Sequence, residues 1–281
     1  MITSNTNLYC VIGNPIKHSK SPIIHNFIFE KIGVDAVYLA FEIKNLQVFF
    51  DFVRDVGVKG VSITIPHKLG ATKLVDKLDE FSSKIGAINT IKNDNGILIG
   101  YNTDVQGVVK SFETRGINTL ENKTALLIGN GGVAKSVAWA FWTMKVGRII
   151  VAGRNTEKLV DFANEVKKYF SEVEVITLDR INDVIKRVDV ISNCTPVGMF
   201  PNVDETPIDL TLVSEEHIVF DTIYNPIDTK LITHSRNIGA RIVYGIDMFV
   251  FQALEQDRIW FDNPQVYSFK DAVINLLNHS Y

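Results

Sequence analysis

Thr124-Ala-Leu-Leu-Ile-Gly-Asn-Gly-Gly-Val-Ala134 is a strand-like apolar run that enters a glycine-rich turn, and a helical pattern follows over Ala134–Met144. Gly129, Gly131 and Ala134 occupy the three positions of the G-x-G-x-x-G/A fingerprint. The first glycine lets the chain turn sharply, the second lets the backbone approach a pyrophosphate, and a small third residue lets helix and strand pack closely. Amides at the helix N-terminus would point at the phosphates. The segment predicts a nucleotide site; the alternative is a glycine-rich connection without a ligand. The predicted site residues here are Gly129, Asn130, Gly131, Gly132, Val133 and Ala134.

The residues after the next apolar run, Arg148–Ala152, indicate which dinucleotide would bind. An acid there would bind the ribose 2′-hydroxyl of NAD, whereas a base would favour the 2′-phosphate of NADP. The chain continues as Gly153-Arg154-Asn155-Thr156 without an acid, and Lys158 follows. The planar donor fork of arginine suits phosphate. We therefore expect NADP, bound with the help of Arg154, Asn155 and Lys158; the alternative is a solvated surface pair.

Six apolar runs, mostly separated by helical patterns, follow the polar stretch Asn118–Lys123. They are Ala125–Ile128, Arg148–Ala152, Val173–Thr177, Val188–Ser192, Ile218–Asp221 and Arg241–Tyr244. Six such runs match the two βαβαβ halves of a dinucleotide-binding domain.

The first hundred residues predict a smaller α/β unit. Its expected strands are Leu8–Ile12, Val37–Ile43, Gly60–Ile65, Ala87–Lys92 and Ile97–Tyr101, and its expected helices are Pro22–Ile32 and Asn45–Val56. Ser21 is a plausible N-cap of the first helix, and Asp94-Asn95-Gly96 is a tight-turn signal that predicts a hairpin. We interpret Phe49, Phe50 and Phe52 as core packing. The residues Asp247–Tyr281 indicate two helices broken near Asn263-Pro264. The fold class is α/β with largely parallel sheets.

The composition bounds the function without naming a reaction. A chain of 281 residues corresponds to about two domains, and 46% apolar and 22% charged residues are ordinary for a globular protein. A net charge of -3 without long like-charge blocks gives little support to nucleic-acid or membrane-surface binding. No apolar run is long enough to span a membrane. Cys10 and Cys194 are far apart and in no metal-ligand spacing, so we expect no metal and a reducing, cytoplasmic location.

Polar clusters end several predicted strands of the first unit, where open α/β sheets place ligands. They are Gly13-Asn-Pro-Ile-Lys-His-Ser-Lys-Ser-Pro22, Ser62-Ile-Thr-Ile-Pro-His-Lys68, Gly86-Ala-Ile-Asn-Thr90 and Gly100-Tyr-Asn-Thr-Asp104. Each alone could be a capped turn. Four together predict a pocket for a small, hydroxyl-rich molecule.

These clusters belong to a longer ordered set of motifs. The set is His18-Ser-Lys-Ser-Pro22, Thr64-Ile-Pro-His-Lys68, Ala87-Ile-Asn-Thr90, Asn102-Thr-Asp104, Gly129-Asn-Gly-Gly132, Asn193-Cys-Thr-Pro-Val-Gly-Met199, Asp221-Thr-Ile-Tyr-Asn-Pro226, and Gly245 through Met248 to Gln252. With it, the chain resembles the shikimate dehydrogenase family over essentially its whole length. The resemblance implies reversible reduction of 3-dehydroshikimate to shikimate with NADPH, on the route to chorismate and aromatic amino acids. It also implies a substrate domain formed by residues 1–105 and 247–281, whose C-terminal helices pack back on it, and an NADP-binding Rossmann domain formed by residues 106–246.

The same resemblance implies a role for each matching residue. Hydride addition to a ketone leaves an alkoxide that must be protonated, and the proton-transferring group is then Lys68, paired with Asp104. A lysine beside a carboxylate can pass a proton, and its charge stabilises the developing oxyanion. The implied substrate-binding residues are Ser19, Ser21 and Tyr224 for the carboxylate, and Ser62, Thr64, Asn89 and Gln252 for the ring hydroxyls. The further implied cofactor-binding residues are Thr195, Met199 and Gly245.

Three departures from the family pattern bear on these assignments. Ser62 stands where most relatives carry Asn, which weakens or alters one contact to a ring hydroxyl. Gly153 and Asn155 replace the outer members of a common Asn-Arg-Thr signature, although Arg154 is kept. Asp257 falls where an aromatic residue is common.

Three alternative functions stay open at this stage. They are a quinate/shikimate dehydrogenase that accepts NAD, a folate-linked dehydrogenase of the same architecture, and a catalytically silent nucleotide-binding protein. The retained Lys68 and Asp104 argue against the last of these. The sequence leaves the oligomeric state open, and a homodimer is compatible with it.

Overall fold

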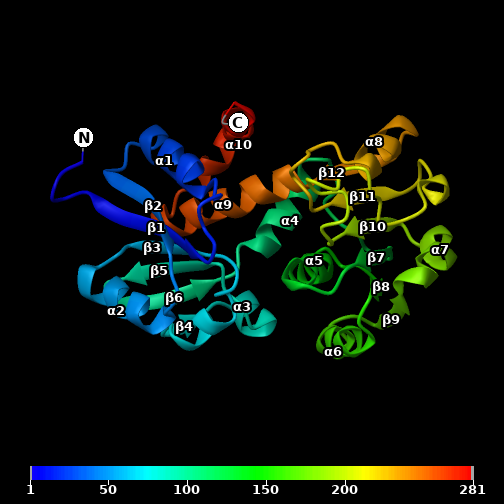
Figure 1. Ribbon diagram of the computed structural model, residues 1–281, viewed down its shortest axis with the longest axis horizontal. Coiled ribbons are helices and arrows are strands. Elements are labelled where there is room, and N and C mark those ends of the chain that lie inside the picture. The colour runs from blue at the N-terminus through cyan, green and yellow to red at the C-terminus, as the bar shows by residue number, and fades with distance from the viewer. Residues whose placement is uncertain (1, 280–281) are drawn as a thin grey trace. The chain divides into compact units, whose positions relative to one another are not determined.

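The computed structural model describes residues 2–279, which form two compact units (Figure 1). The first unit comprises the chain up to Gln106 together with the chain from Val250 onward, and the second is Gly107–Phe249. Each unit contains one six-stranded sheet. Which unit binds which ligand stays a prediction of the sequence.

The first unit has a mixed sheet in the order β2-β1-β3-β5-β6-β4. Its strands are β1 (Asn7–Gly13), β2 (Ala36–Glu42), β3 (Gly60–Ile63), β4 (Lys77–Leu78), β5 (Thr90–Asp94) and β6 (Ile97–Tyr101). The strand β5 runs antiparallel to both β3 and β6, while β1 runs parallel to β2 and β3. The sheet of this unit is therefore mixed, and only the antiparallel pairing of β3 with β5 departs from the expectation. The hairpin that reverses the chain is the predicted one, with Asp94 opposite Ile97 and positive φ at Asn95 (52°) and Gly96 (96°), as a two-residue turn requires.

Helices complete this unit. They are α1 (Ser21–Lys31), α2 (Leu46–Val56), α3 (Glu80–Ile85), the start of α4 (Asp104–Glu113), the end of α9 (Gly245–Phe261) and α10 (Lys270–Asn278). The break between α9 and α10 is a 3₁₀ segment, Pro264–Phe269, at the predicted place.

Three local expectations for this unit are wrong. Ser21 is the first helical residue of α1 rather than its N-cap, which is Lys20, and no side chain caps the helix. Phe52 is 39% exposed because it lies on the outer face of α2, unlike Phe49 and Phe50, which are buried. The strands β3 and β5 are each shorter toward the polar clusters than expected, so that Thr64 and Asn89 lie outside the ladder.

The end of α9 packs against the sheet of the first unit, as the resemblance implied. Trp260 lies in a buried cluster with Tyr9, Phe29 and Tyr38. Its indole Nε1 donates a hydrogen bond to the carbonyl oxygen of Ile91 on β5 (2.9 Å). A Cβ at Gly60 on β3 would lie 2.5 Å from that same Nε1. Glycine at position 60 therefore makes room for the indole.

The second unit has the strand order β12-β11-β10-β7-β8-β9, and all its pairs are parallel. Its strands are β7 (Thr124–Ile128), β8 (Arg148–Gly153), β9 (Glu172–Thr177), β10 (Val190–Asn193), β11 (Ile218–Asp221) and β12 (Arg241–Tyr244). Its helices include α5 (Gly132–Thr143), α6 (Thr156–Val166), α7 (Ile181–Val184) and α8 (Lys230–Asn237). The order is the doubly wound Rossmann order, with the switch point between β7 and β10. The predicted dinucleotide fold is confirmed.

No helix among residues 2–279 combines the length and the apolarity needed to cross a membrane.

Replacing Gly60 by Ala is expected to lower the free energy of unfolding by about 1–3 kcal/mol, because the added methyl group collides with the ring of Trp260. Gly70→Ala in the same unit is the control, since the nearest atom there is the terminal methyl group of Leu46 at 3.1 Å, which can rotate away. Urea unfolding of both variants measures the difference. Equal losses would show that the contact between Gly60 and Trp260 does not constrain the unit.

Candidate active site

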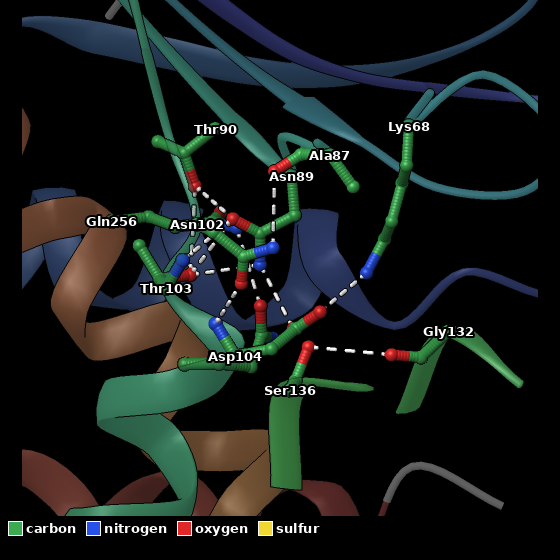
Figure 2. Close-up of polar contacts among 11 residues, drawn as sticks. Lys68, Ala87, Asn89, Thr90, Asn102, Thr103, Asp104, Gly132, Ser136 and Gln256 are labelled. Atoms are coloured by element: carbon green, nitrogen blue, oxygen red, sulfur yellow. Dashed lines mark hydrogen bonds and ion pairs between the residues drawn. The ribbon is translucent and has the colours of Figure 1, made fainter. Parts of the chain in front are cut away.

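The first unit brings Lys68 and Asp104 together (Figure 2). Lys68 follows the loop that leaves β3, and Asp104 is the first residue of α4, three residues after β6 ends. Lysine Nζ donates to carboxylate Oδ2 at 2.6 Å. The lysine side chain is 31% exposed and the aspartate side chain 12%, so the pair is partly covered but reachable. The arrangement places a cation that can transfer a proton next to a carboxylate, beyond the ends of strands β3 and β6.

Asn89 orients this carboxylate. Its amide nitrogen donates to Oδ1 of Asp104 and to the hydroxyl of Thr103, both at 2.9 Å. Its oxygen accepts from the Thr103 amide and the Thr90 hydroxyl, both at 2.8 Å. Both amide protons of Asn89 are therefore committed within the protein, so that any contact with a substrate hydroxyl would have to share them. Its role as a ring-hydroxyl ligand stays a prediction.

Thr90 and Thr103 belong to the quoted motifs but receive no role from the sequence, although they flank the assigned Asn89 and Asp104. Both side chains are buried and both hydroxyls bond Asn89. Asn102 adds a third contact, because its side-chain oxygen accepts from the backbone amide of Asp104 (3.2 Å). The signal available in the sequence was that each of the two threonines stands next to an assigned residue in the same motif.

The loops that follow β1 and β3 lie against each other. The Asn14 amide donates to the carbonyl of Ile65 (3.0 Å), and a Cβ at Gly13 would lie 2.6 Å from the methyl group of Thr64. Ser19 and Ser21 are half-buried on the first loop and the start of α1, and the Ser19 hydroxyl accepts from the Ser21 amide (3.3 Å). The structure thus places Ser19, on the loop after β1, beside the loop that carries Thr64, with Ser21 at the start of the helix that follows.

Ser62 and Gln252 are connected through a residue that the sequence did not indicate. The Ser62 hydroxyl donates to Oε1 of Gln256 (2.5 Å), and Nε2 of Gln256 donates to Oε1 of Gln252 (3.2 Å). Gln252 and Gln256 are one turn apart on α9.

The structure also accounts for Asp257, which has a fully buried histidine as its partner. Its Oδ1 lies 2.8 Å from Nδ1 of His25 on α1. Burial raises the pKa of the Asp257 carboxyl, and His25 opposes this rise. The two residues are 232 positions apart, so no local pattern could have paired them.

In the second unit, the fingerprint residues leave space for a pyrophosphate. Gly129 has φ +115°, and a Cβ there would lie 2.9 Å from the carbonyl oxygen of Cys194. Gly131 is the N-cap of α5 without a side-chain cap, and a Cβ at Gly131 or Gly132 would meet open space. The buried Nδ2 of Asn130 has no hydrogen-bond partner among residues 2–279. Ala134 is fully buried, whereas Val133 is exposed. These features fit the phosphates of a dinucleotide at the helix N-terminus.

The predicted 2′-phosphate ligands follow β8. Arg154 and Lys158 are exposed, and neither forms an ion pair within the described part of the chain. The side-chain oxygen of Asn155 instead caps α6 by accepting from the Lys158 amide (3.0 Å). Leu159 lies beside Gly153, since a Cβ there would be 2.9 Å from a terminal methyl group of Leu159.

The remaining predicted residues lie on the loops after β10 and β11 and at the start of α9. The hydroxyl of Thr195 donates to the side chain of Asn193 (2.7 Å), and Met199 is exposed. Tyr224 is exposed and stacks on Phe249, with ring centroids 4.5 Å apart. Gly245 is required by close backbone packing, since a Cβ there would lie 2.5 Å from the carbonyl oxygen of Ile223.

The side chain of Asp221 connects these two loops through hydrogen bonds. Its carboxylate accepts from the side chain of Asn193 (3.1 Å), the amide of Ile223 (3.1 Å) and the hydroxyl of Thr229 (2.7 Å). Burial raises the pKa of this carboxyl to about 6, although those three bonds oppose the rise.

A Rossmann unit with an open fingerprint turn, joined in one chain to a unit with a lysine–aspartate pair at a sheet edge, defines an oxidoreductase that uses a nicotinamide dinucleotide. Two protein-family models match the chain. The model of the shikimate dehydrogenase substrate binding domain matches residues 11–91, and the model of shikimate / quinate 5-dehydrogenase matches residues 111–203. The chain belongs to the shikimate dehydrogenase family.

Known proteins resemble the chain over almost its entire length. The shikimate dehydrogenase (NADP(+)) of Methanocaldococcus jannaschii is 37% identical, over 98% of this chain and 99% of that protein. A shikimate dehydrogenase crystallised with NADP+ superposes with a TM-score of 0.89 and 34% identity, covering 98% of this chain and 97% of the other. A quinate dehydrogenase from Corynebacterium glutamicum in complex with NAD has a TM-score of 0.90 at 28% identity, covering 96% and 99%.

Asp221→Asn is expected to change how stability depends on pH. Because the folded-state pKa of about 6 lies above the usual 3.8, folding favours the protonated carboxyl. Its stabilising contribution is complete below pH 3.8 and is lost as the pH rises through 6. Between these limits the free energy of unfolding of the wild type should fall relative to that of Asp221→Asn by up to about 3 kcal/mol. Urea unfolding from pH 4 to 7 measures this difference; parallel curves for the two proteins would contradict it.

Proposed function

We propose that this chain catalyses the reversible, NADP-dependent reduction of 3-dehydroshikimate to shikimate, a step of chorismate and aromatic amino-acid biosynthesis. The observation that carries the proposal is the 2.6 Å pair of Lys68 and Asp104 at the edge of the first sheet. Family membership supplies the substrate class, and the open Gly131–Gly132 turn and the exposed Arg154 support the cofactor.

The chain's own residues have separable tasks in this reaction. Bound NADPH supplies the hydride. Lys68 donates a proton to the carbonyl oxygen during reduction and accepts it back during oxidation, while its charge stabilises the oxyanion. Asp104 holds the Lys68 ammonium in place, and Asn89 holds Asp104.

Ser19 and Ser21 are proposed to bind the carboxylate of the substrate, and Thr64, Ser62 and Gln252 are proposed to bind its ring hydroxyls. Asn130, Val133, Ala134 and the glycines around them are proposed to bind the pyrophosphate, with Thr195, Met199 and Gly245 contributing to the cofactor site. The role of Tyr224 toward the substrate stays a prediction.

A quinate dehydrogenase that uses NAD is the second candidate, because one such enzyme has the same fold. The residues after β8 favour the first candidate, since Arg154 and Lys158 are unpaired cations and no acid stands directly at the end of the strand, where it would bind a ribose 2′-hydroxyl. Initial rates with shikimate and with quinate, each with NADP and with NAD, separate the two. Efficient NAD-linked oxidation of quinate would overturn the proposal.

The cytoplasmic location and the homodimer are further proposals. The two free cysteines support a reducing compartment, and cell fractionation tests it. Sedimentation velocity measures the oligomeric state.

Lys68→Ala is expected to lower kcat for shikimate oxidation by about 100-fold or more, because it removes the proton-transferring group. The KM for shikimate should change far less. Lys73→Ala, which removes an exposed lysine five residues along the chain, serves as the control. A normal kcat in Lys68→Ala would exclude Lys68 from the mechanism.

Arg154→Ala is expected to raise the KM for NADP by about tenfold or more while leaving the KM for NAD nearly unchanged, since only NADP carries the 2′-phosphate. Arg241→Ala, another exposed arginine of the same unit, is the control. Steady-state rates with both cofactors test this, and equal effects on NADP and NAD would mean that Arg154 does not contact the phosphate.

A further inference from the structure

A continuous chain of hydrogen bonds crosses the interior of the first unit. It consists, in order, of Tyr38, Ser62, Gln256 and Gln252. The Tyr38 hydroxyl donates to Ser62 (2.5 Å), Ser62 donates to Gln256 (2.5 Å), and Gln256 donates to Gln252 (3.2 Å). The chain joins residues from β2, β3 and α9.

Ser62 and Gln252 in this chain are proposed substrate ligands, whereas Tyr38 and Gln256 are not. Tyr38 is fully buried and Gln256 is 3% exposed, so neither side chain offers a surface for a ligand of its own. Each contacts proposed ligands: Tyr38 contacts Ser62, and Gln256 contacts Ser62 and Gln252.

We infer that Tyr38 and Gln256 are positioning residues that fix the hydrogen-bonding directions of Ser62 and Gln252 toward the substrate. The inference rests on the proposed function. A serine hydroxyl has one proton and two lone pairs. Ser62 gives its proton to Gln256 and uses one lone pair for Tyr38, so that only a lone pair is left for a substrate hydroxyl. Ser62 then acts as an acceptor only, which selects for a hydroxyl group that can donate to it.

Gln256 also supplies a carboxamide beyond the short side chain of Ser62. Serine ends at its hydroxyl, and the Gln256 carboxamide, on a different element, begins 2.5 Å beyond it. An asparagine at position 62 would extend a carboxamide of its own into that region. A single carboxamide can therefore come either from β3 or from α9, and in this chain it comes from α9.

The ring of Tyr38 is held by a contact of its own. It stacks on the ring of His25, with centroids 4.3 Å apart and planes at 25°. His25 in turn contacts Asp257, the neighbour of Gln256 on α9. Two consecutive residues of α9 thus fix Tyr38 through two routes, one through Ser62 and one through His25.

The experiment compares the wild type with Gln256→Ala, Gln256→Ala/Ser62→Asn, Tyr38→Phe and the control Tyr9→Phe. Tyr9 belongs to the same aromatic cluster as Tyr38, but its hydroxyl is not part of the hydrogen-bond chain. The measured quantities are kcat/KM for shikimate, KM for NADP and the thermal unfolding midpoint of each variant.

Gln256→Ala is expected to lower kcat/KM for shikimate by about tenfold or more, mainly through KM, because Ser62 and Gln252 lose a buried partner. The KM for NADP should stay within about twofold of the wild-type value. Adding Ser62→Asn should restore kcat/KM to within about threefold of wild type, because it returns a carboxamide to the same region. Tyr38→Phe should lower kcat/KM by about fivefold or more, and Tyr9→Phe should leave it unchanged.

Three outcomes would refute the inference while leaving the proposed function intact. One is an unchanged kcat/KM in both Gln256→Ala and Tyr38→Phe. Another is a failure of Ser62→Asn to restore activity to a folded Gln256→Ala, since a purely packing role cannot be rescued from position 62. The third is an equal rise in the KM for NADP. If Gln256→Ala does not fold, Tyr38→Phe against Tyr9→Phe decides. A wild type that fails to turn over shikimate would refute the proposed function, and the inference with it.

Discussion

The contact between the indole of Trp260 and the bare backbone of Gly60 is the constraint on which the first unit depends. Any side chain at position 60 would occupy the space of the ring, and the ring nitrogen also bonds the backbone of β5. Gln252, Gln256 and Trp260 are spaced four residues apart, so they lie along one face of α9. Seating Trp260 on the sheet therefore sets the rotation of the helix, and with it the direction in which both glutamines point.

The polar residues of this unit stabilise one another before they meet a ligand. Asn89 spends both amide protons inside the protein, and Asp104 receives one of them while it holds Lys68. Buried groups satisfied in this way are rigid, because each departure from the observed geometry leaves a donor or an acceptor unpaired. The side chains of the site are thus ordered when the protein folds, and ligand binding does not have to order them. In this way a preorganised site lowers the entropy cost of binding.

Features with local signals could be predicted from the sequence. The turn at Gly129 depends on residues within one strand and one helix, and the hairpin at Asn95 depends on two residues with positive φ. The Lys68–Asp104 pair came from motif resemblance, and the structure places the two side chains in contact. The two-residue strand β4 and the pairing of β5 with β3 have no local signature. The partners of Ser62 and His25 lie 194 and 232 residues away, and a buried polar contact over such a separation depends on packing that no pattern reports.

The discontinuity of the first unit has a consequence for its synthesis. The chain from Gly107 to Phe249 is made between the two parts of this unit, so Trp260 and the two glutamines emerge only after the whole second unit. At translation rates of about 5–20 residues per second, that interval lasts roughly 7–30 s. During it the second unit is complete in sequence, while the first unit still lacks Trp260 and both glutamines. The whole Rossmann unit of a nascent chain is therefore made before the cluster of Tyr9, Phe29 and Tyr38 receives its last aromatic member.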